Sequence, residues 1–109
     1  MDNPAQIYLA GLWTVKEGKE AEFAAAWERF AAWTVENQPG AIGGTLLQDV
    51  EDEHRFISFG PWRDLESIKA WRQTPVFADF LATAKELCED VQPRSLRLVA
   101  AVGQKQEAV

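Results

Sequence analysis

Few residues of this sequence could take part in chemistry, and the most informative of them is a single cation. Arg97 interrupts an apolar segment, SLRLVAAV, near the end of the 109-residue chain. An arginine in such a place can hold a negatively charged oxygen of a bound molecule through charge-assisted hydrogen bonds. It can equally pair with a carboxylate such as Asp49 or Glu53, or lie at a sheet edge. Tyr8, in an apolar segment near the other end, offers a hydroxyl to a ligand or to an interface.

The other titratable residues form no pattern typical of acid–base, nucleophilic or metal chemistry. His54 is the single histidine and lies in an acidic stretch, VEDEHR, which we expect to be a solvent-exposed turn. No set of His, Cys, Asp and Glu has the spacing of a metal site. Cys88, the single cysteine, lies among apolar residues, which predicts a buried, unreactive thiol. The sequence therefore predicts no metal and no cofactor.

The composition is typical of one globular domain. With 109 residues, 47% of them hydrophobic, we expect a core over about residues 6–102 and a mobile tail over 103–109. The net charge of -6 and the scattered basic residues argue against nucleic acid or an anionic membrane surface as a partner. No basic stretch precedes a long apolar run, so neither a secretory signal nor a spanning helix is expected. With a single cysteine, the expected location is the cytoplasm.

The hydrophobic periodicity predicts the element order β-α-β-β-α-β. Strands are expected at 6–15, 42–49, 55–60 and from about 95 to 102, with a first helix from residue 17 or 19 to 37. A second helix is capped by Asp64 and broken at Pro75, where Thr74 caps a further helix whose apolar stripe includes Phe80 and Cys88. This order predicts a ferredoxin-like α+β fold, a four-stranded antiparallel sheet with helices on one face.

The strands carry two further expectations. Gly43-Gly44 indicates a bulge or a close approach to the backbone. The first and last strands are apolar on both sides, whereas the helices can cover only one face of the sheet. A second copy of the sheet is the simplest cover for the other face, so we expect a homodimer through that face.

The first helix is rich in aromatic residues. On a helical wheel Phe23, Trp27 and Phe30 form one stripe, with Thr34 below them, and Trp33 lies nearly a quarter-turn away. This stripe packs the helix onto the sheet, and a pocket in such a fold is made from the same face. Trp33 is therefore expected to be a residue of the cavity rim, a dimer contact or an exposed residue.

Three segments resemble a known family. VKEGKEAEFAAAW, NQPG leading into GTLLQD, and RFISFGPW followed by RDLESIKAWRQTPVF are similar to the antibiotic biosynthesis monooxygenase-like family of dimeric α/β barrels. The resemblance covers about residues 7–102. It implies a sheet-to-sheet dimer with a pocket in each subunit between sheet and helices. Characterised members include cofactor-free oxygenases of polycyclic phenols and quinols, and haem-degrading oxygenases.

The resemblance also implies roles for individual residues. In cofactor-free oxygenation the electron-rich substrate reduces oxygen itself, so the protein supplies a dry cavity and a few hydrogen-bond donors. Trp71 matches a pocket tryptophan of the family, and its indole N–H could donate to a phenolate or peroxide; core packing is the alternative. The catalytic candidates are Trp71 and Arg97, and the substrate-binding candidates are Tyr8, Trp27, Phe30 and Phe80.

The leading hypothesis is therefore a cofactor-independent monooxygenase that acts on a phenol-, quinol- or anthrone-like molecule and molecular oxygen. The alternative is a non-catalytic small-molecule-binding or dimerisation module of the same fold. Haem degradation is a third hypothesis. Haem-degrading relatives use a His on the second helix and an Asn on the first strand, whereas this helical stretch, TPVFADFLATAK, has no His and the first strand has no Asn. Both departures argue against haem.

Overall fold

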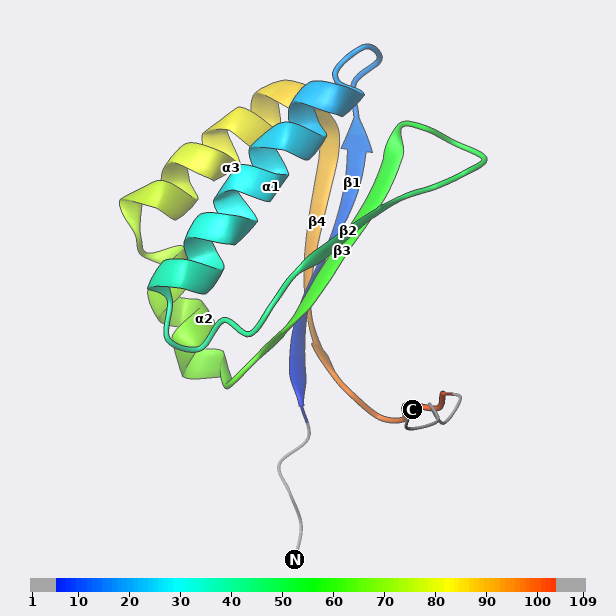
Figure 1. Ribbon diagram of the computed structural model, residues 1–109. Helices are drawn as coiled ribbons and strands as arrows, with labels where there is room; N and C mark the ends of the chain where they lie inside the picture. Colours follow the sequence, from blue (N-terminus) through cyan, green and yellow to red (C-terminus); the bar gives the residue numbers. More distant parts are fainter. Residues whose placement is uncertain (1–5, 104–109) are drawn as a thin grey trace, which may run out of the picture.

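The computed structural model describes residues 6–103, which form one antiparallel sheet with helices on one side. The elements in chain order are β1 (Ile7–Val15), α1 (Glu20–Asn37), β2 (Thr45–Gln48), β3 (Arg55–Trp62), α2 (Leu65–Arg72), α3 (Pro75–Leu87) and β4 (Cys88–Arg97). The strand order is β2-β3-β1-β4, and the three helices cover the same face (Figure 1). The predicted ferredoxin-like α+β fold is confirmed. Within the described residues no helix combines the length and apolar character that crossing a membrane requires.

The last strand begins earlier than predicted. β4 starts at Cys88, not near Ser95, and Cys88 is therefore a strand residue and not part of the preceding helix. Its register with β1 runs from Val15 opposite Cys88 to Ile7 opposite Arg97. β4 is an edge strand, so backbone pairing with β1 defines it even where its side chains are polar and exposed, and Pro93 is tolerated there. The prediction placed this strand on the apolar residues around and after Arg97, but β4 ends at Arg97. Most of the predicted mobile tail, residues 104–109, lies outside the described residues.

The second strand is shorter than predicted. β2 begins at Thr45 and not at residue 42, and the glycines lie in the segment before it. The segment before β2 runs beside the end of β3: Ala41 bridges Trp62, and the Ile42 N–H donates to the Pro61 carbonyl at 3.2 Å. A Cβ atom at Gly60 would lie 2.1 Å from the Gly43 carbonyl oxygen. The predicted close backbone approach is therefore confirmed, and Gly60 is the residue that makes it possible.

The helix-facing side of the sheet holds two clusters of buried side chains. One contains Val15, Phe23, Phe56, Leu87 and Cys88, and the other Phe30, Trp62, Ile68 and Trp71. The predicted stripe of α1 joins both, because Phe23 belongs to the first cluster and Phe30 to the second, with Thr34 also buried. Burial of this stripe packs α1 onto the sheet.

Both predicted helix caps are present. The Asp64 carboxylate accepts from the Ser67 N–H at 2.8 Å and from the Ser67 hydroxyl at 2.7 Å, and these bonds lower the pKa of Asp64. Thr74 Oγ1 accepts from the Phe77 N–H at 3.1 Å, with Pro75 at the first helical position. The caps fix where α2 and α3 begin, and these helices bring aromatic side chains to the sheet.

The other face of the sheet is apolar and uncovered in the single chain. Trp13 and Val15 point toward the helices, so the alternate residues of β1 and their partners face away. These include Leu12, Ile57, Phe59, Leu47 and Leu96, all of which are exposed. The predicted two-sided apolar character of the first strand is thus present in the structure.

Candidate functional site

A cavity of about 350 Å³ lies between the sheet and the helices, within the range of small-molecule pockets. Its large apolar walls come from β1, α1, β3, α2 and α3, namely Leu9, Trp13, Trp27, Phe30, Trp62, Trp71, Phe77 and Phe80. Four of the five tryptophans of the chain are in this wall, and Trp33 is not. The cavity is therefore suited to a flat, apolar molecule.

Phe30 is at the centre of the aromatic wall. Its ring lies parallel to Phe80, with centroids 4.3 Å apart and planes 6° apart, and it stacks on Trp71 at 5.4 Å and 23°. Phe77 packs edge-on against Trp71 at 4.7 Å. These spacings are typical of stabilising aromatic pairs, so α1, α2 and α3 hold each other's rings in place. The wall is consequently preorganised before any ligand binds.

The indole N–H of Trp71 is already engaged within the protein. It donates to Thr34 Oγ1 at 3.0 Å, and both residues are buried and line the cavity. The sequence hypothesis directs this N–H at a phenolate or peroxide, and in this structure the N–H is bonded to Thr34. An indole N–H has a single hydrogen to donate, so any polar contact with a ligand falls to the Thr34 hydroxyl.

A second indole–hydroxyl pair lies across the sheet side of the cavity. Trp13 Nε1 donates to Ser58 Oγ at 2.9 Å, and Ser58 is buried. Gly11 makes this pair possible, because a Cβ atom there would lie 2.8 Å from Trp13 Nε1 and 2.9 Å from Ser58 Oγ. Within residues 6–103 neither the Ser58 nor the Thr34 hydroxyl donates a hydrogen bond of its own. Each can therefore offer its hydrogen to an acceptor in the cavity.

Charged groups are confined to the rim. Arg72, the last residue of α2, and Lys85 of α3 are exposed, and they are the only charged side chains among the lining residues of the described chain. A cation at a rim of otherwise apolar character attracts an anionic oxygen. No carboxylate and no imidazole lines the cavity within residues 6–103.

Four of the six predicted site residues meet in the cavity. Trp27, Phe30, Trp71 and Phe80 line it together. Tyr8 and Arg97 do not line it: Tyr8 pairs with Pro61 and Leu96 on the uncovered face of the sheet, and Arg97 is exposed at the end of β4. These positions give no support to a site role for either residue. Trp33 stacks on Phe30 with planes 9° apart and centroids 6.5 Å apart, outside the cavity lining.

Sequence reasoning missed Trp13, Ser58, Thr34 and the two rim cations as site residues. A usable signal existed for two of them. Trp13 lies on the same side of its strand as Leu9 and Val15. Ser58 lies two residues after Phe56, on the same buried side of β3. A hydroxyl at a buried strand position needs a partner, which marks Ser58 as a polar point in an apolar wall.

The model of the antibiotic biosynthesis monooxygenase family matches residues 6–83, which run from β1 into α3. The chain belongs to this family.

Solved structures of other family-like proteins share the fold. The cofactor-independent oxygenase SnoaB from Streptomyces nogalater superposes with a TM-score of 0.82 at 20% identity, covering 92% of this chain and 99% of that one. The protein PA3566 from Pseudomonas aeruginosa gives a TM-score of 0.77 at 21% identity over 92% of this chain and 100% of its own. At these identities the likeness concerns the fold alone.

Two curated relatives match this family member in sequence. An uncharacterised protein of Synechocystis sp. is 30% identical over 86 residues, which are 79% of this chain and 56% of the relative. A mycobilin-producing haem oxygenase of Mycobacterium tuberculosis is 40% identical over 53 residues, which are 47% of this chain and 50% of the relative. The chain thus spans about half the length of the curated relatives it matches.

The relationship to a haem oxygenase raises the question of whether the cavity fits haem. The side chains that usually ligate haem iron are His, Cys, Met and Tyr. None of these types is among the lining residues of the described chain. His54, the only histidine, lies before β3 beside Glu20, and Cys88 lies in the buried cluster at the start of β4. The donor set of this cavity therefore does not fit haem.

Proposed function

We propose that this chain is a cofactor-independent monooxygenase that binds a flat phenol-, quinol- or anthrone-like molecule in its aromatic cavity. The observation that supports this most is the pairing of stacked aromatic walls with two buried hydroxyls, Ser58 and Thr34, whose hydrogens are free. Flat walls suit a polycyclic ring system, and hydroxyl donors suit its carbonyl or phenolate oxygens. Membership of the monooxygenase family points to the same chemistry.

The proposed reaction uses the substrate as the only reductant. An anthrone-type CH₂ group loses a proton to give a carbanion, which transfers electrons to O₂ and forms a C–O bond. The O–O bond then breaks: one oxygen atom stays on the carbon as C=O, and the other leaves as water with the two hydrogens of the original CH₂. Atoms and electrons balance for one substrate and one O₂.

The chain would contribute stabilisation of the deprotonated substrate. The Thr34 and Ser58 hydroxyls each accept an indole N–H, and a hydroxyl that accepts such a bond becomes a better donor. Two polarised donors in a dry cavity favour the enolate or phenolate form over the neutral substrate. Arg72 and Lys85 at the rim would draw in an anionic ring system. Trp71 would act as a wall of the site and as the group that orients Thr34.

We also propose that two copies pair through the uncovered sheet face. Ile57 and Leu96 are 48% and 47% exposed there, and Leu12 and Phe59 are 38% and 37% exposed. Contiguous apolar surface of this kind is rare on monomers and typical of interfaces. Closed two-fold symmetry would cover the same face on both copies.

The decisive experiment combines binding and turnover. Anthrone and quinol compounds are added while tryptophan fluorescence and oxygen uptake are followed, with ¹⁸O₂ in a parallel reaction. We expect quenching, uptake of one O₂ per substrate and one labelled oxygen in the product. Trp71→Phe should lower the rate, because Thr34 loses the donor that polarises and orients it. Trp33→Phe is the matched control, since Trp33 lies outside the lining, and it should retain the activity.

The other outcomes separate the alternatives. Quenching without oxygen uptake would favour the non-catalytic binding module. The lack of any lining carboxylate or imidazole within residues 6–103 is consistent with that alternative. Neither quenching nor uptake with any of these compounds would reject the proposed substrate class. A stoichiometric Soret band after addition of haemin would overturn the conclusion that the cavity does not fit haem.

A further inference from the structure

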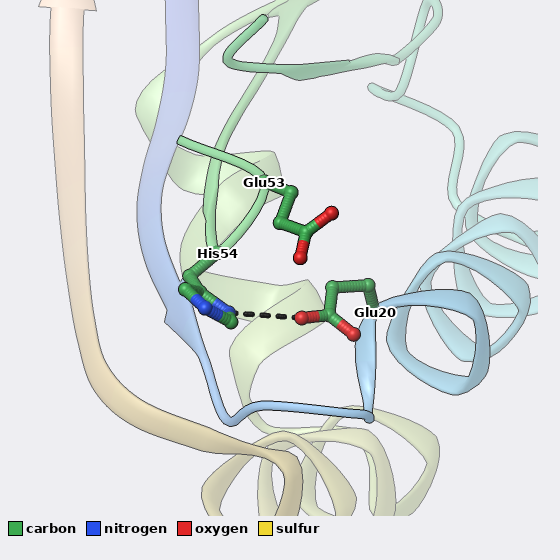
Figure 2. A group of neighbouring side chains, drawn as sticks. All are labelled: Glu20, Glu53 and His54. Carbon is green, nitrogen blue, oxygen red and sulfur yellow. Dashed lines mark ion pairs between the residues drawn. The ribbon is translucent and has the colours of Figure 1, made fainter. Parts of the chain in front are cut away.

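A second cluster of polar side chains lies outside the cavity, at one end of the sheet. Glu20 is the first residue of α1, and Glu53 and His54 are neighbours just before β3. One ligand-type atom from each of these three residues lies within 4.8 Å of the other two. Figure 2 shows the carboxylates of Glu20 and Glu53 and the ring of His54 directed toward one another. Two segments far apart in the sequence thus place three potential metal ligands together.

The closest pair in this cluster lies at ion-pair distance but does not have the geometry of a hydrogen bond. His54 Nδ1 and Glu20 Oε2 are 2.8 Å apart, yet within the described residues both atoms lack a hydrogen-bond partner. Both atoms are also shielded from solvent, although the His54 and Glu20 side chains as wholes are 35% and 21% exposed. Such a short contact between two shielded polar atoms, without a hydrogen bond, calls for a physical explanation.

A shared cation explains this contact. Two ligand atoms that bind one ion at about 2.1 Å lie about 3.0 Å apart at the octahedral angle of about 90° and about 3.4 Å apart at the tetrahedral angle. The 2.8 Å between His54 Nδ1 and Glu20 Oε2 is close to the octahedral separation. In a hydrogen bond the N–H points at the oxygen, whereas in a metal site both lone pairs point at a third position. A 2.8 Å contact without a hydrogen bond agrees with the second arrangement.

The local charges favour a cation at this position. Glu20 and Glu53 each bring a negative charge to a protein whose net charge is already -6. The neighbouring basic side chains are paired elsewhere: Lys19 with Glu22 at 3.7 Å, and Arg55 with Asp52 at 3.4 Å. Within residues 6–103 no lysine or arginine forms an ion pair with either glutamate of the cluster.

The backbone holds the ligands in place without a metal. The His54 carbonyl accepts from the Val15 N–H at 2.7 Å, which attaches the turn to the end of β1. The His54 N–H donates to Asp52 Oδ1 at 3.1 Å. Glu20 is fixed by the first turn of α1, where the Phe23 N–H donates to the Lys19 carbonyl at 2.9 Å. A site built on such fixed backbone needs little reorganisation when an ion binds.

We propose that Glu20, Glu53 and His54 bind one divalent transition-metal ion, with water completing its coordination. An imidazole with two carboxylates suits ions such as Zn²⁺ better than Mg²⁺, which prefers oxygen ligands alone. None of the three residues lines the aromatic cavity, so the role of the ion is structural. It links the turn before β3 to the start of α1 and stabilises the folded chain by preferential binding.

The test uses Zn²⁺ alone on the full chain, first treated with a chelator and then transferred to chelator-free buffer. Calorimetry at about pH 7.5 should show one Zn²⁺ per chain, and the melting temperature should rise with Zn²⁺. His54→Gln and Glu20→Gln should each weaken binding about tenfold or more, since each removes one ligand. Glu51→Gln is the matched control: it removes a charge from the same turn outside the cluster and should bind like the parent chain.

Three results would overturn the proposal. One is the absence of Zn²⁺ binding, and another is equal affinity in the parent chain and the His54→Gln variant. The third is an equal rise in melting temperature with Mg²⁺. If the variants melt lower than the parent without metal and none of the proteins responds to Zn²⁺, the cluster is an ion pair of protonated His54 with Glu20. Far-UV circular dichroism confirms that each variant is folded, and Glu53→Gln provides a third variant at an exposed position.

Discussion

Trp71 Nε1 donates a 3.0 Å hydrogen bond to Thr34 Oγ1, and the two residues are only 7% and 6% exposed. The bond joins α2 to the C-terminal half of α1 across the cavity wall. It satisfies the one polar atom of a buried indole and leaves the hydroxyl hydrogen of Thr34 available. A side chain that the sequence marks as a possible hydrogen-bond donor to a ligand thus donates to a neighbouring hydroxyl.

The first prediction concerns this bond. Thr34→Val keeps the shape of the side chain but leaves the Trp71 N–H unpaired in a buried position. The free energy of unfolding should fall by about 1–3 kcal/mol. Urea denaturation measures this difference. Thr34→Ser is the control, because it retains the hydroxyl and should also retain ligand binding. A valine variant as stable as the parent chain would show that this hydrogen bond contributes nothing.

The second prediction concerns the space beside Gly11. Gly11→Ala places a methyl group against Trp13 Nε1 and Ser58 Oγ, so the indole must move and the Trp13–Ser58 bond is lost. The affinity for an aromatic ligand should fall about tenfold, the equivalent of one hydrogen bond. Ser58→Ala should have a similar effect, and the double variant should be little worse than either single variant.

The control for this pair is another glycine of the cavity. A Cβ atom at Gly43 would meet no heavy atom within 4 Å, so Gly43→Ala should bind the ligand as the parent chain does. Titration of tryptophan fluorescence measures all four variants. If Gly11→Ala and Gly43→Ala bind equally well, the Trp13–Ser58 pair has no part in recognition.

The fold was accessible from the sequence because its determinants are local. Alternating or helical spacing of apolar residues, the caps at Asp64 and Thr74, and a break at Pro75 are all written in short segments. β4 was misplaced because an edge strand with exposed polar side chains has no such pattern, and only its pairing with β1 defines it. Periodicity therefore gave the element order but not the bounds of that strand.

The site was only partly accessible because it depends on distances across the fold. The aromatic wall could be predicted, since Phe30, Trp71 and Phe80 lie on apolar stripes that must face the sheet. The role of the Thr34 hydroxyl could not, because its partner is 37 positions away. The approach of Glu20 to His54 likewise depends on the end of β1 lying beside the turn before β3.

A third prediction concerns Cys88, whose burial raises the pKa of its thiol to about 11. The folded state therefore holds the proton more tightly than the unfolded state does. The corresponding stability is complete below the unfolded pKa, near 9.0, and is lost as the pH rises through about 11. In this window the free energy of unfolding should fall with a slope of at most about 1.4 kcal/mol per pH unit from this group.

Comparison with Cys88→Ala isolates that contribution, because every other titratable group is the same in both proteins. Urea denaturation from about pH 8 to about pH 11 should show a smaller decline for the alanine variant. Alkylation by iodoacetamide should be slow in the folded protein and fast in urea. Rapid alkylation without denaturant would contradict a buried, protonated thiol.

A fourth prediction concerns the cap of α3. Thr74 Oγ1 accepts from the Phe77 N–H at 3.1 Å and donates to the Trp71 carbonyl at 2.8 Å. Thr74→Ala should lower the free energy of unfolding by about 1 kcal/mol, and Thr74→Ser should restore most of it. Thr83→Ala, at an exposed position within the same helix, is the matched control and should be neutral or slightly stabilising. Thermal unfolding that ranks the two alanine variants equally would exclude the cap as a stabilising element.

The last prediction tests the uncovered sheet face. Ile57→Lys places a charge in the middle of the apolar face, where a second copy would have to desolvate it. We expect sedimentation to change from dimer to monomer. Leu65→Lys is a close control, because Leu65 is 50% exposed, like Ile57 at 48%, but lies on α2 on the helix side. A lysine there should leave the dimer intact. A parent chain that sediments as a monomer would refute pairing through this face, and dissociation by both lysines would show that added charge alone, not its place on the sheet, separates the copies.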